Sequence, residues 1–292
     1  MGSPNAHLPV WRKTPFILFI CVAVVATLLL IERTNSVVTV NSEDTSILNE
    51  KVRVYYSEQS ADRQRLLGSY LDPNTAPKGF GPFYNALVAE SVCPWLVRVG
   101  NVNDGGKWTC NPWALPDNCV IYSLGVGPDI TFELEIFKVS EERCKIYSFD
   151  PDPKKGQRLV DLVSEQFTFT PLLIAMETND SLHQKTVADI MEQFDHSFID
   201  FLKVDIEGAE FGTLPALLAD RNKPVACQIL IEMHRTPHEC AKLYNQFGKA
   251  GYFMFSYELN GYYPTSSEYS FMHESCFHRY GITKVLTRNF PQ

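Results

Sequence analysis

Acidic side chains follow a short apolar run in the second half of the chain. Residues 198–204 are rich in aromatic and β-branched side chains, which favours a strand that is covered on both faces. The run leads directly into Asp205, Glu207 and Glu210. Open α/β sheets bind ligands at the carboxyl ends of their strands, so these carboxylates are candidates for a functional site. The alternative is a strand end with solvated acids and no chemical role.

Two strand ends upstream carry residues suited to a nucleoside. Gly125 and Gly127 follow one predicted strand, and their bare backbone can turn tightly and approach a ligand, although a purely structural turn would use glycine as well. Asp150 ends the next strand, where an acid accepts hydrogen bonds from ribose hydroxyls. The residue three positions after Gly127 is Ile130, which disfavours a dinucleotide site. The combination predicts an adenosine-type cofactor.

A further acid and an imidazole, Glu232 and His234, end the strand that follows the acidic turn. Asp205 and His234 would then lie at the ends of adjacent strands, and we expect them to be the catalytic pair that takes a proton from an acceptor. We expect Glu207, Glu210 and Glu232 to support that site or hold the start of the next helix. The alternative for His234 is a hydrogen-bonded surface or capping histidine.

Strand and helix patterns alternate through most of the chain, which predicts a doubly wound, mostly parallel sheet with right-handed crossovers. An antiparallel pair, 252–257 and 269–272, would close the sheet. The predicted strands are 120–124, 145–149, 167–175, 198–204 and 228–233. The predicted helices are 131–139, 156–165, 186–194, 210–218 and 237–250.

Composition limits the function classes. The 292 residues are 45% hydrophobic, which is enough for one sizeable core with an appendage. The formal net charge of −8 argues against a nucleic-acid partner, because nucleic-acid-binding proteins usually present a basic face.

The amino terminus predicts a membrane anchor. Residues 16–31 are sixteen uncharged residues, about 24 Å of helix, and follow Arg12 and Lys13. No small-residue cleavage site follows the run, so we expect an uncleaved type II signal anchor of the endoplasmic reticulum or Golgi, with the catalytic domain in the lumen. The expected divisions are a cytoplasmic tail (1–14), the transmembrane anchor (15–31), a lumenal stem (32–90) and the catalytic domain (91–292).

A lumenal location makes the cysteines candidates for disulfides. The chain has eight, of which Cys21 lies in the predicted anchor, so an odd number remains and at least one is free or paired between chains. We predict a Cys110–Cys119 bridge, because the two enclose a short loop rich in proline. Asn179 begins an Asn-Asp-Ser acceptor site for glycosylation.

The octet KVDIEGAE at residues 203–210, with Glu232-Met233-His234 downstream, resembles the signature of FkbM-type S-adenosylmethionine-dependent methyltransferases. The resemblance covers roughly residues 92–275. Further segments are similar to the methyltransferase-like protein 24 group; they are Asp104-Gly105-Gly106-Lys107-Trp108-Thr109-Cys110, Cys119, Ser123-Leu124-Gly125, Phe132-Glu133 and Phe149-Asp150-Pro151.

This resemblance implies a class I methyltransferase fold, which is Rossmann-like, with S-adenosylmethionine bound across the first two strands. Gly125 and Gly127 would lie under its methionine part, and Asp150 would hold the ribose. Class I enzymes often carry an acid two residues before the first glycine, where this chain has Ser123. Glu133 and Asp104 are the candidates to anchor the methionine amino group instead.

The resemblance further implies an O-methyltransferase, because FkbM relatives methylate hydroxyl groups, often of sugars. We expect a glycan or another small hydroxylated acceptor, and no metal ion. One alternative is a glycosyltransferase in which Asp150 and Asp152 hold Mn²⁺ and a nucleotide sugar. A second alternative is a non-catalytic binding protein that keeps the fold, which the serine at position 123 would favour.

Overall fold

The structure is a computed structural model that describes residues 42–161 and 165–291. The chain divides into two units between residues 50 and 51, and the sheet and the core described below belong to the second unit. The predicted anchor, residues 15–31, lies outside the described residues. Within the described residues, no helix combines the length and the hydropathy that a membrane crossing requires.

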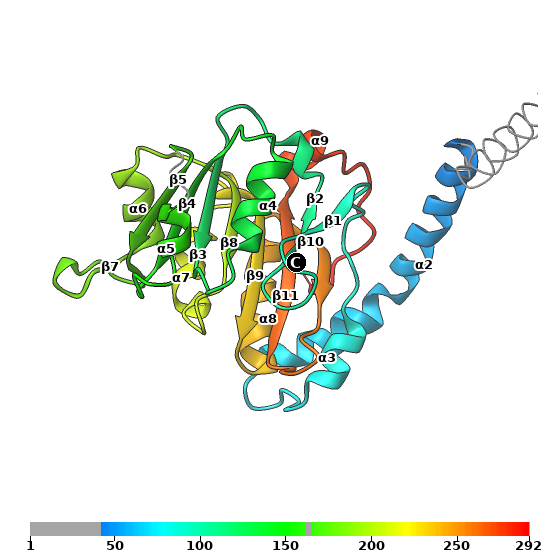
Figure 1. Ribbon diagram of the computed structural model, residues 1–292. Coiled ribbons are helices and arrows are strands. Elements are labelled where there is room, and N and C mark those ends of the chain that lie inside the picture. Colours follow the sequence, from blue (N-terminus) through cyan, green and yellow to red (C-terminus); the bar gives the residue numbers. More distant parts are fainter. Residues whose placement is uncertain (1–41, 162–164, 292) are drawn as a thin grey trace, which may run out of the picture. The chain divides into compact units, whose positions relative to one another are not determined.

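A seven-stranded sheet forms the centre of the second unit (Figure 1). Five neighbouring strands are parallel, and β11 runs antiparallel between β9 and β10. The predicted doubly wound arrangement with a closing antiparallel pair is therefore confirmed. The order across the sheet is β10 (Tyr252–Glu258), β11 (Ser266–His273), β9 (Ala226–His234), β8 (Ile199–Val204), β3 (Val120–Leu124), β4 (Lys145–Asp150) and β5 (Phe167–Pro171).

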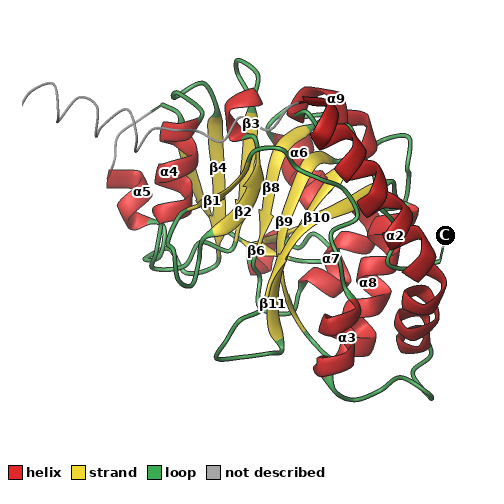
Figure 2. Cartoon of the chain, turned by 90° about the vertical axis from the view of Figure 1, so that its right-hand side faces the viewer, coloured by secondary structure: helices red, strands yellow, loops and turns green. Residues whose placement is uncertain are grey.

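Helices connect these strands and flank the sheet (Figure 2). Thr186 caps α6 by accepting a hydrogen bond from the backbone nitrogen of Asp189, and Thr236 and Glu239 form a capping box at the start of α8. The helices are α2 (Ser42–Gly68), α3 (Phe80–Ala86), α4 (Thr131–Val139), α5 (Gln157–Asp161), α6 (Val187–Gln193), α7 (Glu210–Leu217), α8 (Pro237–Lys249) and α9 (Phe277–Tyr280). Short 3-10 helices occupy Ser69–Leu71, Pro112–Ala114, Asp180–Leu182 and Glu274–Cys276.

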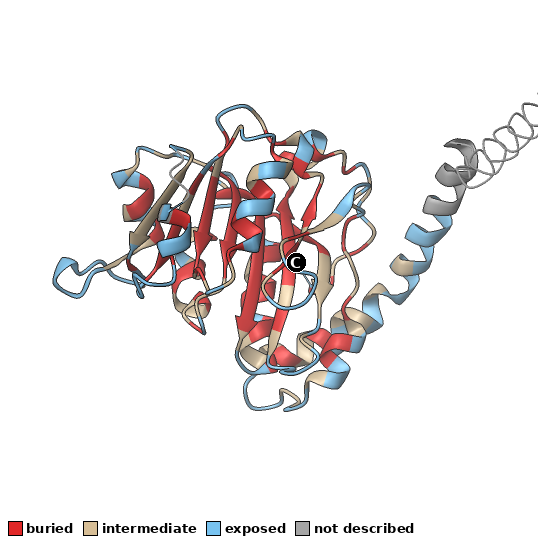
Figure 3. Cartoon of the chain, viewed as in Figure 1, coloured by how far each residue is buried: buried red, intermediate tan, exposed pale blue. Residues whose placement is uncertain are grey.

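Both faces of the sheet are buried, as the apolar strands predict (Figure 3). Successive residues of a strand point to opposite faces, so the side chains of β3 divide between two core clusters, with Tyr122 in one and Ile121 in the other. The first cluster packs against α6, α7 and α8, and the second against α4 and α9. The two layers of helices hold the strand ends in fixed positions.

The core also draws on the segment that was expected to be a stem, residues 32–90. Leu67, Tyr70, Phe83 and Leu87 are fully or almost fully buried in the larger core cluster. From Leu67 onward this segment is therefore part of the domain, because its apolar side chains cover the face of the sheet that carries α8.

A small antiparallel sheet of β1 (Leu96–Val99) and β2 (Lys107–Cys110) packs beside β9 and β11. The buried side-chain amide of Gln228 on β9 exchanges two hydrogen bonds with the backbone of Cys110, at 3.0 and 2.7 Å. These bonds fix β2 over the main sheet and bring its first residue, Lys107, toward the carboxyl ends of the strands. A second small sheet joins β6 (Leu173–Ile174) to β7 (Gln184–Lys185).

The predicted Cys110–Cys119 bridge is wrong. Cys110 pairs with Cys93, because the β1–β2 hairpin places the segment that leads into β1 beside the end of β2. Cys119 pairs with Cys144, since each immediately precedes one of two adjacent parallel strands, β3 and β4, and their Cα atoms lie 4.3 Å apart. The expectation of one leftover thiol is confirmed by Cys240, which is free and buried.

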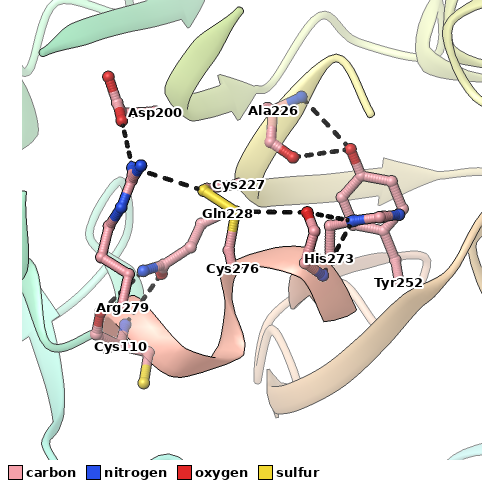
Figure 4. Close-up of a disulfide and its surroundings, with 10 residues drawn as sticks. Cys110, Asp200, Ala226, Cys227, Gln228, Tyr252, His273, Cys276 and Arg279 are labelled. Atoms are coloured by element: carbon pink, nitrogen blue, oxygen red, sulfur yellow. Dashed lines mark hydrogen bonds and ion pairs between the residues drawn. A yellow bond between two sulfur atoms is a disulfide. The ribbon is translucent and has the colours of Figure 1, made fainter. Parts of the chain in front are cut away.

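A third bridge, Cys227–Cys276, joins the start of β9 to the 3-10 helix before α9 (Figure 4). Arg279 lies beside it and donates a 2.8 Å hydrogen bond to Asp200 at the start of β8. The amino ends of β3, β4 and β9 are therefore each held by a disulfide, and that of β8 by an ion pair.

Candidate functional site

The direction of the chain across the sheet reverses between β3 and β8. From β3 the sheet grows through β4 to β5 on one side, and through β8 and β9 on the other. Such a switch point leaves a crevice at the carboxyl ends of the strands, where doubly wound folds bind ligands. A cleft of about 220 Å³ opens there, and five predicted site residues line it: Gly125, Gly127, Asp150, Asp205 and Glu207.

The turn that contains Gly125 and Gly127, called the glycine turn, lies against the turn that begins at Asp205. Gly125 has φ 82°, and a Cβ atom there would lie only 1.7 Å from the carbonyl oxygen of Asp205, so no other residue fits. The backbone nitrogen of Asp205 in turn donates to the carbonyl of Leu124 at 2.9 Å. Gly127 has a different role, because a Cβ atom there would meet only the nitrogen of Asp129, at 3.9 Å. That glycine keeps part of the cleft open.

A buried polar cluster supports the glycine turn from beneath. Lys203 donates to the carbonyl of Gly125 at 2.7 Å and lies 3.5 Å from Oε1 of Glu133. Ser123 donates to the same Glu133 oxygen at 2.5 Å. Ser123 and Glu133 are fully buried and do not line the cleft, and Oε2 of Glu133 has no hydrogen-bond partner among the described residues. Asp104 is exposed and lines a different cleft.

Asp150 ends β4 with both carboxylate oxygens in use. Oδ1 accepts from the backbone nitrogen of Asp152 at 2.9 Å, and Oδ2 lies 3.4 Å from Nζ of Lys155. Lys155 is almost half exposed and can swing away when a hydroxyl group takes its place. Asp152 caps its own loop by accepting from the backbone nitrogen of Lys154 at 2.9 Å. The Asp150–Asp152 pair thus serves the loop that borders the cleft.

A dense polar cluster, which we call the strand-end cluster, lies beside Asp205. Its members come from five segments and comprise five carboxylates, one lysine and one histidine: Lys107, Asp205, Glu207, Glu210, Glu232, His234 and Glu268. Glu232 and Glu268 stand directly opposite each other on β9 and β11, where two like charges repel. Lys107 offsets this repulsion, because its Nζ contacts Glu268 and lies 3.3 Å from Asp205 and 3.7 Å from Glu232.

His234 is held in one orientation within the strand-end cluster. Its Nδ1 donates to Oε1 of the fully buried Glu210 at 2.9 Å, since a carboxylate can only accept. Its Nε2 faces three carboxylate oxygens, at 3.6 Å from Glu232 and 3.8 Å from both Asp205 and Glu207. The structure thus brings together all the residues that the sequence predicted as catalytic or site-supporting.

The charges of the strand-end cluster shift its pKa values. Burial alone would lower the pKa of His234, but the bond to Glu210 and the surrounding carboxylates raise it to about 9. Burial, together with the charges of Glu268 and Asp205, raises the pKa of Glu232 to about 8. Burial would also raise the pKa of Asp205, but Lys107, Lys203 and His234 hold it below its usual value. The lowered pKa keeps the carboxylate of Asp205 ionised at neutral pH.

Three residues that matter here were not assigned a role from the sequence. Lys203 interrupts an apolar strand, and such a buried lysine is a detectable signal. Lys107 is part of the quoted DGGKWTC segment, but nothing local indicates that its side chain reaches strand ends formed about 100 residues later. Glu268 carries no local signal at all, because its position depends on the pairing of β11 with β9.

A family model described as a methyltransferase domain matches residues 50–273. Human methyltransferase-like protein 24 is 28% identical over 124 residues, and the rat protein of that name is 30% identical over 123 residues. Each match covers 40% of this chain and about a third of the relative (32% and 33%).

Two solved structures show weaker likeness. One is a methyltransferase FkbM from Methylobacillus flagellatus, with a TM-score of 0.43 and 15% identity, over 53% of this chain and 44% of that one. The other is a Methanococcus jannaschii fibrillarin pre-rRNA processing protein, with a TM-score of 0.39 and 10% identity, over 55% of this chain and 68% of that one.

The cofactor of a methyltransferase domain of this kind is S-adenosylmethionine, and the cleft fits it. Asp150 stands where the ribose hydroxyls need an acceptor, and Gly127 leaves the space that a side chain would fill. Ser123 and Glu133 would act from below the glycine turn, without facing the cleft. Because the family model spans most of the chain and the switch-point cleft has the expected residues, the chain belongs to this family of methyltransferase domains.

Proposed function

We propose that the protein is an O-methyltransferase of the secretory pathway, which transfers a methyl group from S-adenosylmethionine to a hydroxyl of a glycan or of another small hydroxylated acceptor. The observation that carries this proposal is the position of Asp205. Asp205 lines the cofactor cleft and is also part of the strand-end cluster. Its carboxylate therefore lies beside the place of the methyl donor, where it can accept a proton from the acceptor.

When bound, S-adenosylmethionine supplies a methyl group on a positively charged sulfur, whose bond to the methyl carbon breaks as the acceptor oxygen takes the methyl. The chain must hold the acceptor in line with the donor and receive the hydroxyl proton. Lys107 occupies one oxygen of Asp205, Oδ2, and leaves Oδ1 facing His234 and the cleft side. We assign proton acceptance to the carboxylate of Asp205, because its lowered pKa keeps it ionised. The neighbouring side chains of Lys107 and His234 stabilise the negative charge of Asp205.

A second cleft supports a sugar acceptor. It measures about 250 Å³ and reaches the strand-end cluster at Glu268. Tyr262 and Tyr263, which are 80% and 67% exposed, stand beside polar groups such as Asn103 and Asp104. Exposed aromatic faces pack against the C–H faces of sugar rings, while the polar groups around them can bond hydroxyls. Asp104 is on this account an acceptor-side residue.

Three observations support the proposed location in the endoplasmic reticulum or Golgi lumen, behind an anchor at residues 15–31. The domain contains three disulfides, which form and persist in oxidising compartments. The sixteen-residue apolar run and its basic flank have the pattern of a signal anchor. Asn179 lies in an exposed turn, where a glycan can be attached.

Isothermal titration of the purified full chain with S-adenosylhomocysteine tests cofactor binding. Mass spectrometry of glycans from cells with and without the protein then tests the acceptor, through a loss of about 14 daltons per methylated site. We expect Asp205→Asn to lower methyl transfer by about 10²–10⁴-fold, while binding of S-adenosylhomocysteine changes by less than about tenfold. Absence of binding at millimolar ligand, with the fold intact, would refute the cofactor site.

The non-catalytic alternative predicts a different pattern. A binding protein that retains the fold would take up S-adenosylhomocysteine and yet leave every lumenal glycan unmethylated. The glycosyltransferase alternative loses its support, because the family model is that of a methyltransferase domain.

A further inference from the structure

We infer that Asp205, Glu207 and His234 form a binding site for one divalent transition-metal ion, with Mn²⁺ as the matched probe. The sequence alone favoured a site without metal, because an organic cofactor is sufficient to explain the acids. The inference deepens the proposed function, since the role of the ion in catalysis rests on it. The binding site itself is argued from geometry alone.

The first argument is the spacing of the ligand atoms. One oxygen of Asp205, one of Glu207 and Nε2 of His234 all lie within 4.8 Å of one another. Nε2 is 3.8 Å from each of the two oxygens, which is too long for a hydrogen bond. Ligand atoms about 2.1 Å from a common ion lie about 3 Å apart when adjacent and about 4.2 Å apart when opposite. The two 3.8 Å separations fall within this interval and the third is at most 4.8 Å, so the three ligand atoms need only move closer together to hold one ion.

The second argument is the fixed histidine. Metal-binding histidines donate their other ring N–H to a carboxylate, which sets the tautomer and aims the free nitrogen at the metal. Glu210 does this for His234, at 2.9 Å from Nδ1. Glu210 is fully buried, and its second oxygen has no hydrogen-bond partner among the described residues. A buried carboxylate that orients a histidine in this way is the arrangement expected behind a metal ligand.

The third argument is charge. The strand-end cluster contains five carboxylates, and Lys107 contacts three of them, Asp205, Glu232 and Glu268. Glu207 and Glu210 receive no such contact from it. The second oxygen of Glu268 is also without a hydrogen-bond partner among the described residues. A divalent cation at Nε2 of His234 would lie next to Glu207 and Glu210, the two carboxylates that Lys107 does not reach.

The donor set selects the kind of ion. Two carboxylates and one imidazole suit Mn²⁺, Zn²⁺ or Fe²⁺ better than Ca²⁺ or Mg²⁺, which prefer sites made of oxygen alone. Glu207 is 86% exposed on its side chain, so the site opens to the cleft and leaves coordination positions for an acceptor oxygen. An acceptor hydroxyl held there would lose its proton more readily.

The test is a titration of the full chain with MnCl₂, followed by the electron paramagnetic resonance signal of free aqueous Mn²⁺, which disappears on binding. We expect one ion per chain in the absence of S-adenosylmethionine. Zn²⁺ should displace Mn²⁺ at lower concentration than Mg²⁺ or Ca²⁺ does, because of the imidazole ligand. Equal displacement by Ca²⁺ and Zn²⁺ would indicate a plain acidic surface and overturn the inference.

Two variants locate the site. Glu207→Gln should weaken Mn²⁺ binding at least tenfold without loss of fold, since Glu207 is highly exposed. His234→Gln should weaken it further. Glu177→Gln, at an exposed carboxylate outside the cluster, is the matched control and should bind Mn²⁺ as the unmodified chain does. An unchanged dissociation constant in Glu207→Gln and His234→Gln would overturn the inference.

The outcomes separate the metal site from the methyltransferase proposal. Mn²⁺ binding that depends on Glu207, without methyl transfer to any lumenal glycan, leaves the metal site standing and refutes the proposed function. Methyl transfer that survives complete chelation, in a protein that binds no Mn²⁺, refutes the metal site and leaves the function standing.

Discussion

The two ends of the central parallel strands are built on opposite principles. The amino ends are cross-linked by Cys119–Cys144 and Cys227–Cys276, and the carboxyl ends bear the strand-end cluster and the cofactor cleft. At the amino end, Asp200 is matched by one arginine, Arg279, and its second oxygen accepts from the backbone nitrogen of Val120 at 3.0 Å. Both carboxylate oxygens of Asp200 are therefore satisfied.

At the carboxyl ends the charges do not balance. Five carboxylates share one lysine and one histidine, and two of their buried oxygens, on Glu210 and Glu268, lack a hydrogen-bond partner within the described part of the chain. Incomplete pairing of this kind lowers stability and leaves groups ready to bind a ligand. The contrast implies that substitutions at the amino end alter stability, whereas those at the carboxyl end alter binding, with one exception.

That exception is Lys107, which should give the largest effect on stability. Lys107→Met leaves the buried carboxylates of Glu232 and Glu268 facing each other without a cation, so we expect the free energy of unfolding to fall by about 3–5 kcal/mol. Urea unfolding in the presence of a chelator measures this loss of stability. Lys145→Met, at the exposed start of β4, is the control and should change stability by less than about 0.5 kcal/mol. Equal effects of the two would remove the contrast between the ends.

The disulfides at the amino ends should come next. Replacement of both cysteines of a pair by alanine should cost about 2–4 kcal/mol. The Cys227–Cys276 loop spans 49 residues and the Cys119–Cys144 loop 25, so loss of the longer loop should cost roughly 0.6 kcal/mol more. Thermal or urea unfolding tests this order. Affinity for S-adenosylhomocysteine should stay the same in both variants, and a tenfold loss would show that the two ends are coupled.

The same substitution at both ends gives the sharpest comparison. Asp200→Asn removes the charge that faces Arg279 and should cost about 1–2 kcal/mol of stability, with unchanged binding of S-adenosylhomocysteine. Asp150→Asn should instead weaken that binding at least tenfold, because the ribose loses its charged acceptor, and should change stability less than Asp200→Asn does. Calorimetric titration measures the binding of S-adenosylhomocysteine by both variants, and urea unfolding measures their stability. The reverse pattern would contradict the placement of the cofactor.

The smallest effect on stability is expected at Gly127. Alanine there meets only one backbone atom at 3.9 Å, so the free energy of unfolding should change by less than about 0.5 kcal/mol. The added methyl group reduces the space of the cleft, and affinity for S-adenosylhomocysteine should fall severalfold. Gly79→Ala, where a Cβ atom meets nothing within 4 Å, is the control and should leave that affinity as it is.

Much of the site was predictable because its parts are local. The apolar runs and their acidic or glycine ends predicted the strands and a site at their carboxyl ends. Gly125, Asp150 and Asp205 line the cleft there, and His234 lies beside Asp205. This works because parallel strands of one sheet end at the same edge, so residues that follow separate strands are brought together by topology alone.

The disulfide pairing and the position of Lys107 could not be predicted from local sequence patterns. The pairing of Cys119 with Cys144 follows from β3 lying beside β4, and the closeness of Cys110 and Cys119 along the chain was misleading. Lys107 reaches the strand-end cluster only because the β1–β2 hairpin packs against β9 and β11. The sequence determined which strands end in functional groups, since that is a property of each segment. Only the tertiary structure decided which charges and sulfur atoms meet, because contacts between distant segments depend on how the layers pack.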